Sequence, residues 1–321
     1  MKRLLLILLM LPVMALAWEP TRPVAVVIGN APGAGNELAF RKLSQIINRT
    51  NKKITFVVEN RAGADSVIAM NHMMQVAPDG HTIAAFNHMS QYVTQDIWQQ
   101  DIKRYEYNSF EDVLTIGKSP LVLVAISTSA VNTPDEFATV LRTTQNPVFV
   151  AVGSGAHRIT YEYLMIKTGG NRNLVKHISF NGPAQALQSV ASSAGGTEFG
   201  IMPLAIARPL IEAGRVKAIG ITGDRKIAQM PNIPLLRRIA PGINVFAAWN
   251  LVLPPRTDRV IVDYYADLFA RAINTVEYQE WMDQNLIFVD SRELDPGGLR
   301  QHAQELRRTF LPLANQINSN E

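Results

Sequence analysis

The chain contains no cysteine among its 321 residues and only six histidines. The absence of cysteine excludes disulfide bonds, thiolate-bound zinc or iron–sulfur clusters, a cysteine nucleophile and a lipid-bearing N-terminal cysteine. The six histidines are scattered along the sequence and leave little for a metal cluster. We therefore expect neither a bound metal nor a cofactor.

The sequence also lacks a large excess of either basic or acidic residues. The chain has 31 basic and 27 acidic residues, a formal charge of +4, and only 18% charged residues in total. The two signs are interspersed without a long basic run, so we expect no nucleic-acid partner. The length and the 47% of hydrophobic residues suit one large or two modest domains with a sizeable core.

The N-terminus carries the longest apolar run, and it is too short to span a bilayer. Lys2-Arg3 precede the run from Leu4 to Leu11, Pro12 interrupts it, and Ala15-Leu16-Ala17 has the small-x-small form of a signal peptidase site. We predict a signal peptide over residues 1–17, cleavage after Ala17 and a soluble periplasmic protein. The mature chain would have 321 − 17 = 304 residues and a charge of 29 − 27 = +2.

Strand-length apolar runs alternate with segments of helical period along the rest of the chain. Phe40, Leu43 and Ile47, for example, share one face of a helix. Strands are expected at 24–28, 54–58, 82–86, 121–126, 148–152, 174–179, 198–202, 216–222 and 246–253. Helices are expected at 36–49, 65–76, 134–143, 158–167, 183–193, 204–213, 258–274 and 296–318. This alternation predicts an α/β fold with two lobes, each a mostly parallel sheet flanked by helices.

Ligands of open α/β sheets bind where strands end and the next helices begin. Two glycine-rich turns occupy such places, at 29–36 and 153–158. Free N–H groups at a helix start carry partial positive charge and can hold an anion without a cationic side chain. The first turn matches neither the dinucleotide fingerprint nor a P-loop, since Leu38 replaces the third glycine and no Lys-Ser or Lys-Thr follows.

The second turn, from Gly153 to Arg158, leaves two interpretations open. It can be a second anion cradle, or Ser154 and His157 can belong to an exported hydrolase. The G-x-S-x-G pattern is absent and no orienting acid is evident, so we favour the cradle. Polar residues after other strands are further candidates: Asn87, His88, Ser90 and Asn181.

Several motifs appear in the order and spacing of one family. They are Thr21-Arg22-Pro23, Ala31-Pro32-Gly33, the stretch 57–63 (VVENRAG), the stretch 77–82 (APDGHT) and the stretch 249–255 (WNLVLPP). The chain resembles the periplasmic solute-binding receptors of tripartite tricarboxylate transporters, also called Bug receptors, from about Thr21 to its C-terminal helix.

The resemblance implies a Venus-flytrap fold in which residues 18–120 and 223–321 form one lobe and 121–222 the other. It also implies capture of a small carboxylate, an organic acid or amino acid, by backbone N–H groups of two facing loops. The implied ligand-binding residues are Asn30, Gly33, Ala34, Gly35, Asn36, Ser66, Asn87, Ser90, Ser154, Gly155, Ala156, His157, Asn181 and Met202.

The sequence departs from the family at two places near the expected cleft. The family's run of glycines followed by Thr-Asp reads Gly33-Ala34-Gly35-Asn36-Glu37, and Asp65 stands where glycine or asparagine is usual. Either carboxylate would repel a second ligand carboxylate and favour an ammonium group.

The resemblance also implies partners. We expect a monomer that closes on its ligand and delivers it to a membrane permease, or, in a sensory alternative, presents it to a membrane histidine kinase.

Overall fold

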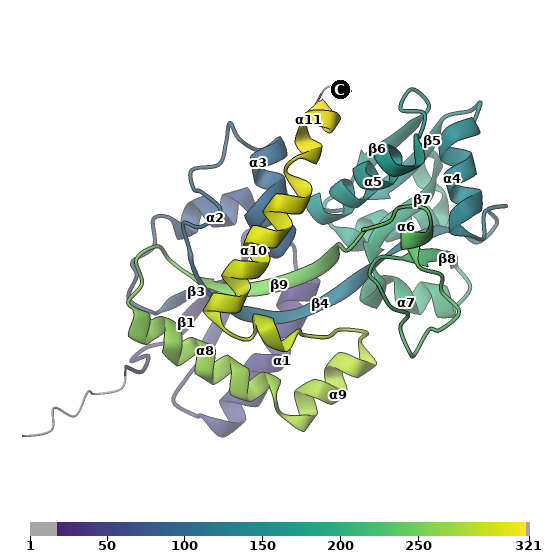
Figure 1. Ribbon diagram of the computed structural model, residues 1–321. Helices are drawn as coiled ribbons and strands as arrows, with labels where there is room; N and C mark the ends of the chain where they lie inside the picture. Colours follow the sequence, from purple (N-terminus) through teal and green to yellow (C-terminus); the bar gives the residue numbers. More distant parts are fainter. Residues whose placement is uncertain (1–17, 319–321) are drawn as a thin grey trace, which may run out of the picture.

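The computed structural model describes residues 18–318, so the predicted signal peptide lies outside the described residues. Two lobes lie side by side and are joined by the long strand β4 (Glu111–Ile126) (Figure 1). Among the residues described, no helix has the length and apolar character needed to cross a membrane.

The first lobe contains strands from both halves of the chain. Its sheet has the order β2-β1-β3-β9-β4. The strands are β1 (Val24–Ile28), β2 (Phe56–Asn60), β3 (Thr82–Asn87), β9 (Phe246–Leu253) and the first part of β4. The helical segments are α1 (Gly35–Thr50), η1 (Ala64–Ser66), α2 (Val67–Met73), η2 (Ser90–Thr94), α3 (Gln95–Trp98), α8 (Arg259–Ile273), α9 (Val276–Gln284), η5 (Ser291–Glu293), α10 (Pro296–Phe310) and α11 (Leu313–Asn318).

The second lobe is built from the middle of the chain. The second part of β4 pairs with β7 and β8, and the order continues through β5 to β6. The strands are β5 (Val148–Val152), β6 (Val175–Ser179), β7 (Thr197–Pro203) and β8 (Val216–Ile221). The helical segments are α4 (Pro134–Thr143), α5 (Gly155–Thr168), α6 (Pro183–Ser192), η3 (Ala194–Gly196) and α7 (Leu204–Glu212), and η4 (Leu236–Arg238) lies in the connection to β9.

Strand β4 changes partners between Pro120 and Leu121. Residues from Glu111 to Pro120 pair with β9, whereas Leu121 to Ile126 pair with β7 and β8. The change of partners falls beside residue 121, where the sequence analysis placed the start of the second lobe; that boundary stays a prediction. The sequence showed only the last third of this strand, because buried polar residues such as Asp112 and Lys118 hide the strand character of its first part.

The two-lobed α/β prediction is confirmed, with one difference in strand direction. The pairs of β1 with β2 and β3, and of β5 with β6 and β7, are parallel. The four pairs made by β4 or β9 are antiparallel. Each sheet is therefore mixed, because β9 is antiparallel to both of its neighbours in the first lobe and β4 is antiparallel to β7 and β8 in the second.

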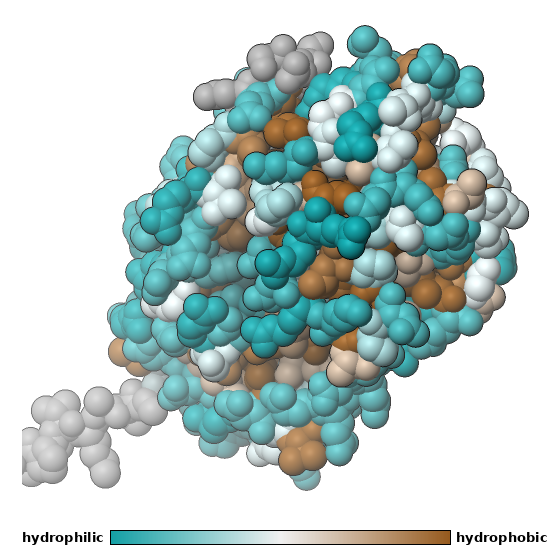
Figure 2. All heavy atoms as spheres, turned by 45° about the vertical axis from the view of Figure 1, so that its right-hand side comes forward, coloured by the Kyte–Doolittle hydropathy of each residue, from teal (hydrophilic) through white to brown (hydrophobic). Residues whose placement is uncertain are grey.

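Helical periodicity correctly identified the buried faces. Phe40, Leu43 and Ile47 of α1 are at most 1% exposed and pack in the main core cluster. On the outside, hydrophobic residues appear only as patches between hydrophilic ones on the face shown in Figure 2.

A buried carboxyl group lies on the first part of β4. Asp112 accepts hydrogen bonds from the Tyr92 hydroxyl (2.7 Å) and the Gln91 amide (3.3 Å), and Asn250 donates to the same tyrosine oxygen (3.0 Å). Burial raises the pKa of Asp112 from 3.8 to about 6, although the two hydrogen bonds oppose the shift.

This raised pKa predicts a pH-dependent loss of stability. Because the folded protein binds the Asp112 proton more tightly than the unfolded chain, the stabilisation is complete below pH 4 and is lost as the pH rises through about 6. Relative to Asp112→Asn, the free energy of unfolding of the native protein should fall by about 2 kcal/mol between pH 4 and pH 7. Urea denaturation of the native protein and of Asp112→Asn across this pH range measures the difference. If the free energies of unfolding of the two proteins change with pH by the same amount, the dependence comes from other groups.

Candidate functional site

Helices α1 and α5 both begin without a side-chain cap. Ala34 and Ser154 occupy the N-cap positions with extended backbones, and neither side chain accepts a hydrogen bond from its helix. Among residues 18–318, no partner is found for the backbone N–H groups of Gly35, Asn36 and Ala156. Such groups carry the partial positive charge of the helix start. Each lobe therefore offers N–H donors suited to an anion.

Both helix starts line one cavity between the lobes. Its lining contains no Asp, Glu, Lys or Arg side chain. The lining residues are Asn30, Ala34, Gly35, Asn36, Asn87, Met89, Ser154, Ala156, His157, Pro183, Pro203, Ile206, Phe246, Ala247, Ala248 and Trp249. An anion in this cavity would be held by backbone and neutral polar groups, with apolar side chains around the remainder of the ligand.

Three asparagines are connected at the first-lobe side of the cavity. The Asn36 amide donates to Asn30 Oδ1 (2.9 Å) and to the Ala85 carbonyl (2.9 Å), and the Asn87 amide donates to the same Asn30 oxygen (3.3 Å). The β1–α1 turn is thereby tied to the end of β3. These bonds hold the start of α1 in place before any ligand arrives.

His157 contributes a neutral imidazole on the second-lobe side. Its Nδ1 accepts the backbone N–H of Gly153 (3.1 Å), so the ring proton is on Nε2. Burial lowers the pKa of His157 to about 3. With Nδ1 occupied and Nε2 protonated, this ring has no free lone pair to take a proton from Ser154. The hydrolase interpretation consequently lacks its general base.

Eight of the fourteen predicted binding residues line the cavity. They come from the β1–α1 turn, the end of β3 and the β5–α5 turn, as expected for loops at strand ends. They are Asn30, Ala34, Gly35, Asn36, Asn87, Ser154, Ala156 and His157.

Three of the other six are engaged by acidic side chains. The backbone N–H of Gly33 donates to Glu37 Oε2 (2.9 Å). The Ser90 hydroxyl donates to Asp65 Oδ2 (2.9 Å), and the backbone N–H of Gly155 donates to the same carboxylate. These donors are occupied within the protein and lie outside the cavity lining.

The remaining three lie away from the cavity for different reasons. Ser66 is buried and its hydroxyl donates to the Gly29 carbonyl (3.0 Å). Met202 is fully buried in the hydrophobic cluster of the second lobe. Asn181 is exposed, and its backbone N–H donates to Gln185 Oε1 (3.3 Å).

Neither acidic residue that we expected near the ligand lines the cavity. Glu37 forms an ion pair with Arg41 (2.6 Å), and although burial opposes it, the bonds to Arg41, Gly33 and Asn60 lower the pKa of its carboxyl. Burial raises the pKa of Asp65, whose carboxylate is enclosed between the lobes. The cavity thus has no carboxylate to attract an ammonium group.

The apolar part of the lining was missed by sequence reasoning. Pro183, Pro203 and Ile206 come from helix starts in the second lobe, and Phe246 and Trp249 from β9. The position of β9 between β3 and β4 brings its aromatic residues to the cavity. The sequence feature that could have pointed to β9 is the stretch 249–255. It was used for the family resemblance, but its residues suggest no particular binding chemistry.

Comparison with known proteins identifies the family. The family model described as the tripartite tricarboxylate transporter family receptor matches residues 39–308. The chain belongs to this family. It is a solute-binding receptor and not an enzyme.

Individual relatives are distant in sequence but similar in fold. A protein from Cupriavidus necator, "UPF0065 protein in gbd 5'region", is 26% identical over 268 residues, which are 81% of this chain and 77% of that protein. MatC from Rhodopseudomonas palustris, solved with bound malate, has a TM-score of 0.83 at 22% identity and covers 92% of this chain and 100% of its own. Rpa4515 from R. palustris, solved with adipate, has a TM-score of 0.82 at 18% identity, with 94% and 97% covered.

Proposed function

We propose that this protein captures a small carboxylate-bearing metabolite between its lobes in the periplasm and delivers it to a membrane permease. The observation that carries the proposal is the placement of two uncapped helix starts, one from each lobe, on a single cavity without charged side chains. Backbone donors bind a carboxylate strongly once the lobes close over it, since charge-assisted hydrogen bonds gain strength where water is excluded.

The arrangement favours a closing mechanism. A carboxylate that accepts hydrogen bonds from α1 and α5 bridges both lobes, and it therefore binds the closed conformation better than an open one. The lobes are already in contact in this structure, where the Arg158 guanidinium lies 4.1 Å from the centre of the Trp98 ring. The closed shape would then be the form that the permease recognises.

The lining also narrows the ligand class. Malate and adipate are the ligands named for two structural neighbours, and both are carboxylates. Because no Asp or Glu side chain lines the cavity of this chain, an organic acid fits it better than an amino acid.

Native mass spectrometry of the protein as purified tests the proposal, because a trapped metabolite would reveal its mass. A thermal-shift panel of C2 to C8 carboxylates and amino acids complements it. Saturation at a hundredfold excess over Kd should stabilise the protein by about 2.7 kcal/mol. If no panel member raises the Tm and no mass is retained, the proposed function is wrong.

A further inference from the structure

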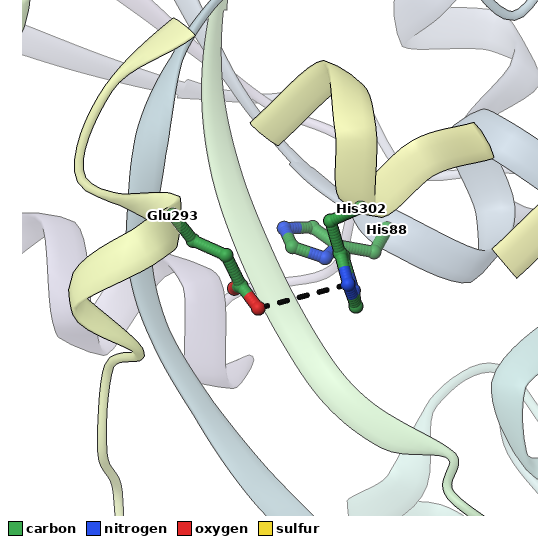
Figure 3. A group of neighbouring side chains, drawn as sticks. All are labelled: His88, Glu293 and His302. Carbon is green, nitrogen blue, oxygen red and sulfur yellow. Dashed lines mark ion pairs between the residues drawn. The ribbon is translucent and has the colours of Figure 1, made fainter. Parts of the chain in front are cut away.

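Three potential metal ligands from separate segments come together beneath α10. His88 follows β3, Glu293 ends η5 and His302 lies in α10. One ligand atom from each lies within 4.8 Å of those of the other two. Figure 3 shows the Glu293 carboxylate facing the His302 imidazole, with the His88 imidazole beside them, and its dashed line marks the pair of Glu293 Oε1 with His302 Nδ1 (3.7 Å).

Two polar atoms of this cluster are buried without a partner among residues 18–318. They are His88 Nδ1 and Glu293 Oε2, on residues that are 1% and 3% exposed. His88 Nε2 is 3.2 Å from the Thr115 hydroxyl, which accepts its proton when Nδ1 holds the free lone pair. A buried acceptor without a donor costs about 1–3 kcal/mol. A bound ion or donor beside these two atoms would remove that cost.

The other carboxylate oxygen of Glu293 is already neutralised. Lys118 Nζ lies 2.7 Å from Glu293 Oε1, and its ammonium also faces the rings of Phe246 (5.6 Å) and Phe288 (5.3 Å). The lysine fixes the carboxylate in place and leaves Oε2 available. The same ammonium repels a cation, so only an ion bound through strong coordinate bonds would be retained.

A small hollow adjoins the cluster and is lined by His88, Lys118, His302 and Phe246, among others. Its free space is close to that of a single water molecule, which is enough for one ion. Two imidazole nitrogens and one carboxylate oxygen suit Zn²⁺ and similar transition metals, whereas Ca²⁺ and Mg²⁺ require mainly oxygen ligands.

We propose that His88 Nδ1, Glu293 Oε2 and one imidazole nitrogen of His302 bind a divalent transition-metal ion of the Zn²⁺ type. The Nε2–H bond of His88 to Thr115 would orient the ring, as outer hydrogen bonds commonly do for metal-binding histidines. The ion would tie α10 and η5 to the end of β3 beside β4.

Metal titration of the protein, first treated with EDTA and dialysed, tests this site. We expect one Co²⁺ per chain with the visible absorption of a four-coordinate site, displacement by Zn²⁺, and a rise in Tm that EDTA reverses. His302→Ala and His302→Gln should each weaken binding at least about tenfold. His302 is suited to substitution because its side chain is 25% exposed.

The matched control is His72→Ala in α2, a histidine outside the cluster. Binding should be unchanged in this variant, and circular dichroism should confirm that all three variants are folded. Failure to bind either metal overturns the proposal, as does a folded His302 variant with native affinity, because the ion would then lie elsewhere. Carboxylate binding is a separate property, so its presence or absence neither supports nor overturns the metal site.

Discussion

Replacing Ala34 by aspartate should abolish ligand capture without unfolding the protein. Ala34 is the N-cap of α1 and lines the cavity, and aspartate is among the best N-cap residues. Its carboxylate would accept the free N–H groups of the helix start and repel a ligand anion. We expect affinity to fall at least about 100-fold, equivalent to two charge-assisted hydrogen bonds, while the Tm is kept or raised.

The matched control is Ala31→Asp, which adds the same charge to an exposed position of the same turn. This variant should keep the co-purifying mass in native mass spectrometry and the thermal shift with carboxylates, and Ala34→Asp should lose both. Equal retention in the two variants would show that the start of α1 is not the anion cradle.

Replacing Asp65 by alanine should destabilise the protein by about 2–4 kcal/mol, since three buried donors would lose their shared acceptor. The Asp65 carboxylate accepts hydrogen bonds from Ser90 (2.9 Å), Thr94 (3.2 Å) and the backbone N–H of Gly155. The contact is close, because a Cβ at position 155 would lie 2.4 Å from Asp65 Oδ2. Urea denaturation measures the loss.

Asparagine at position 65 should restore most of this stability. Asp65 has a left-handed backbone (φ 50°, ψ 46°), which asparagine tolerates better than alanine, and the amide oxygen can still accept a hydrogen bond. Asp101→Ala, an exposed acidic position, should change stability by less than about 0.5 kcal/mol. An Asp65→Ala variant as stable as this control would mean that the hydrogen bonds add nothing.

The same substitution should loosen the contact between the lobes. Ser90 and Thr94 belong to the first lobe and Gly155 begins α5 of the second, so this carboxylate joins the two across the cleft. Small-angle scattering of ligand-free Asp65→Ala should give a larger radius of gyration than the native protein. If the radius of gyration is unchanged, other contacts hold the lobes together, such as the stacking of the Arg158 guanidinium on the Trp98 ring.

Local sequence signals determined the bounds of several elements. The bounds expected for α4, β5 and β9 match those observed. For α4 the physical reason is visible, because Thr133 and Glu136 form a capping box and Pro134 opens the helix. Glycine-rich turns after strands likewise identified the two helix starts that line the cavity, since turn chemistry is encoded by neighbouring residues.

Long-range contacts decided the rest. The first part of β4 is a strand because it pairs with β9, although its polar residues conceal this in the sequence. Asp65 was expected to face the ligand, but the Ser90 and Thr94 hydroxyls draw it into the contact between the lobes. Neither outcome is encoded within the segment concerned.

The sequence by itself determined a two-lobed solute receptor with a helix start from each lobe at its cavity. Only the tertiary structure decided which polar groups remain free there, because Glu37 and Asp65 each occupy donors of the expected loops. It also assembled His88, Glu293 and His302, which are separated by up to 214 positions in the chain, into one cluster. Scattered histidines say nothing of a metal site until packing brings their nitrogens to a common point.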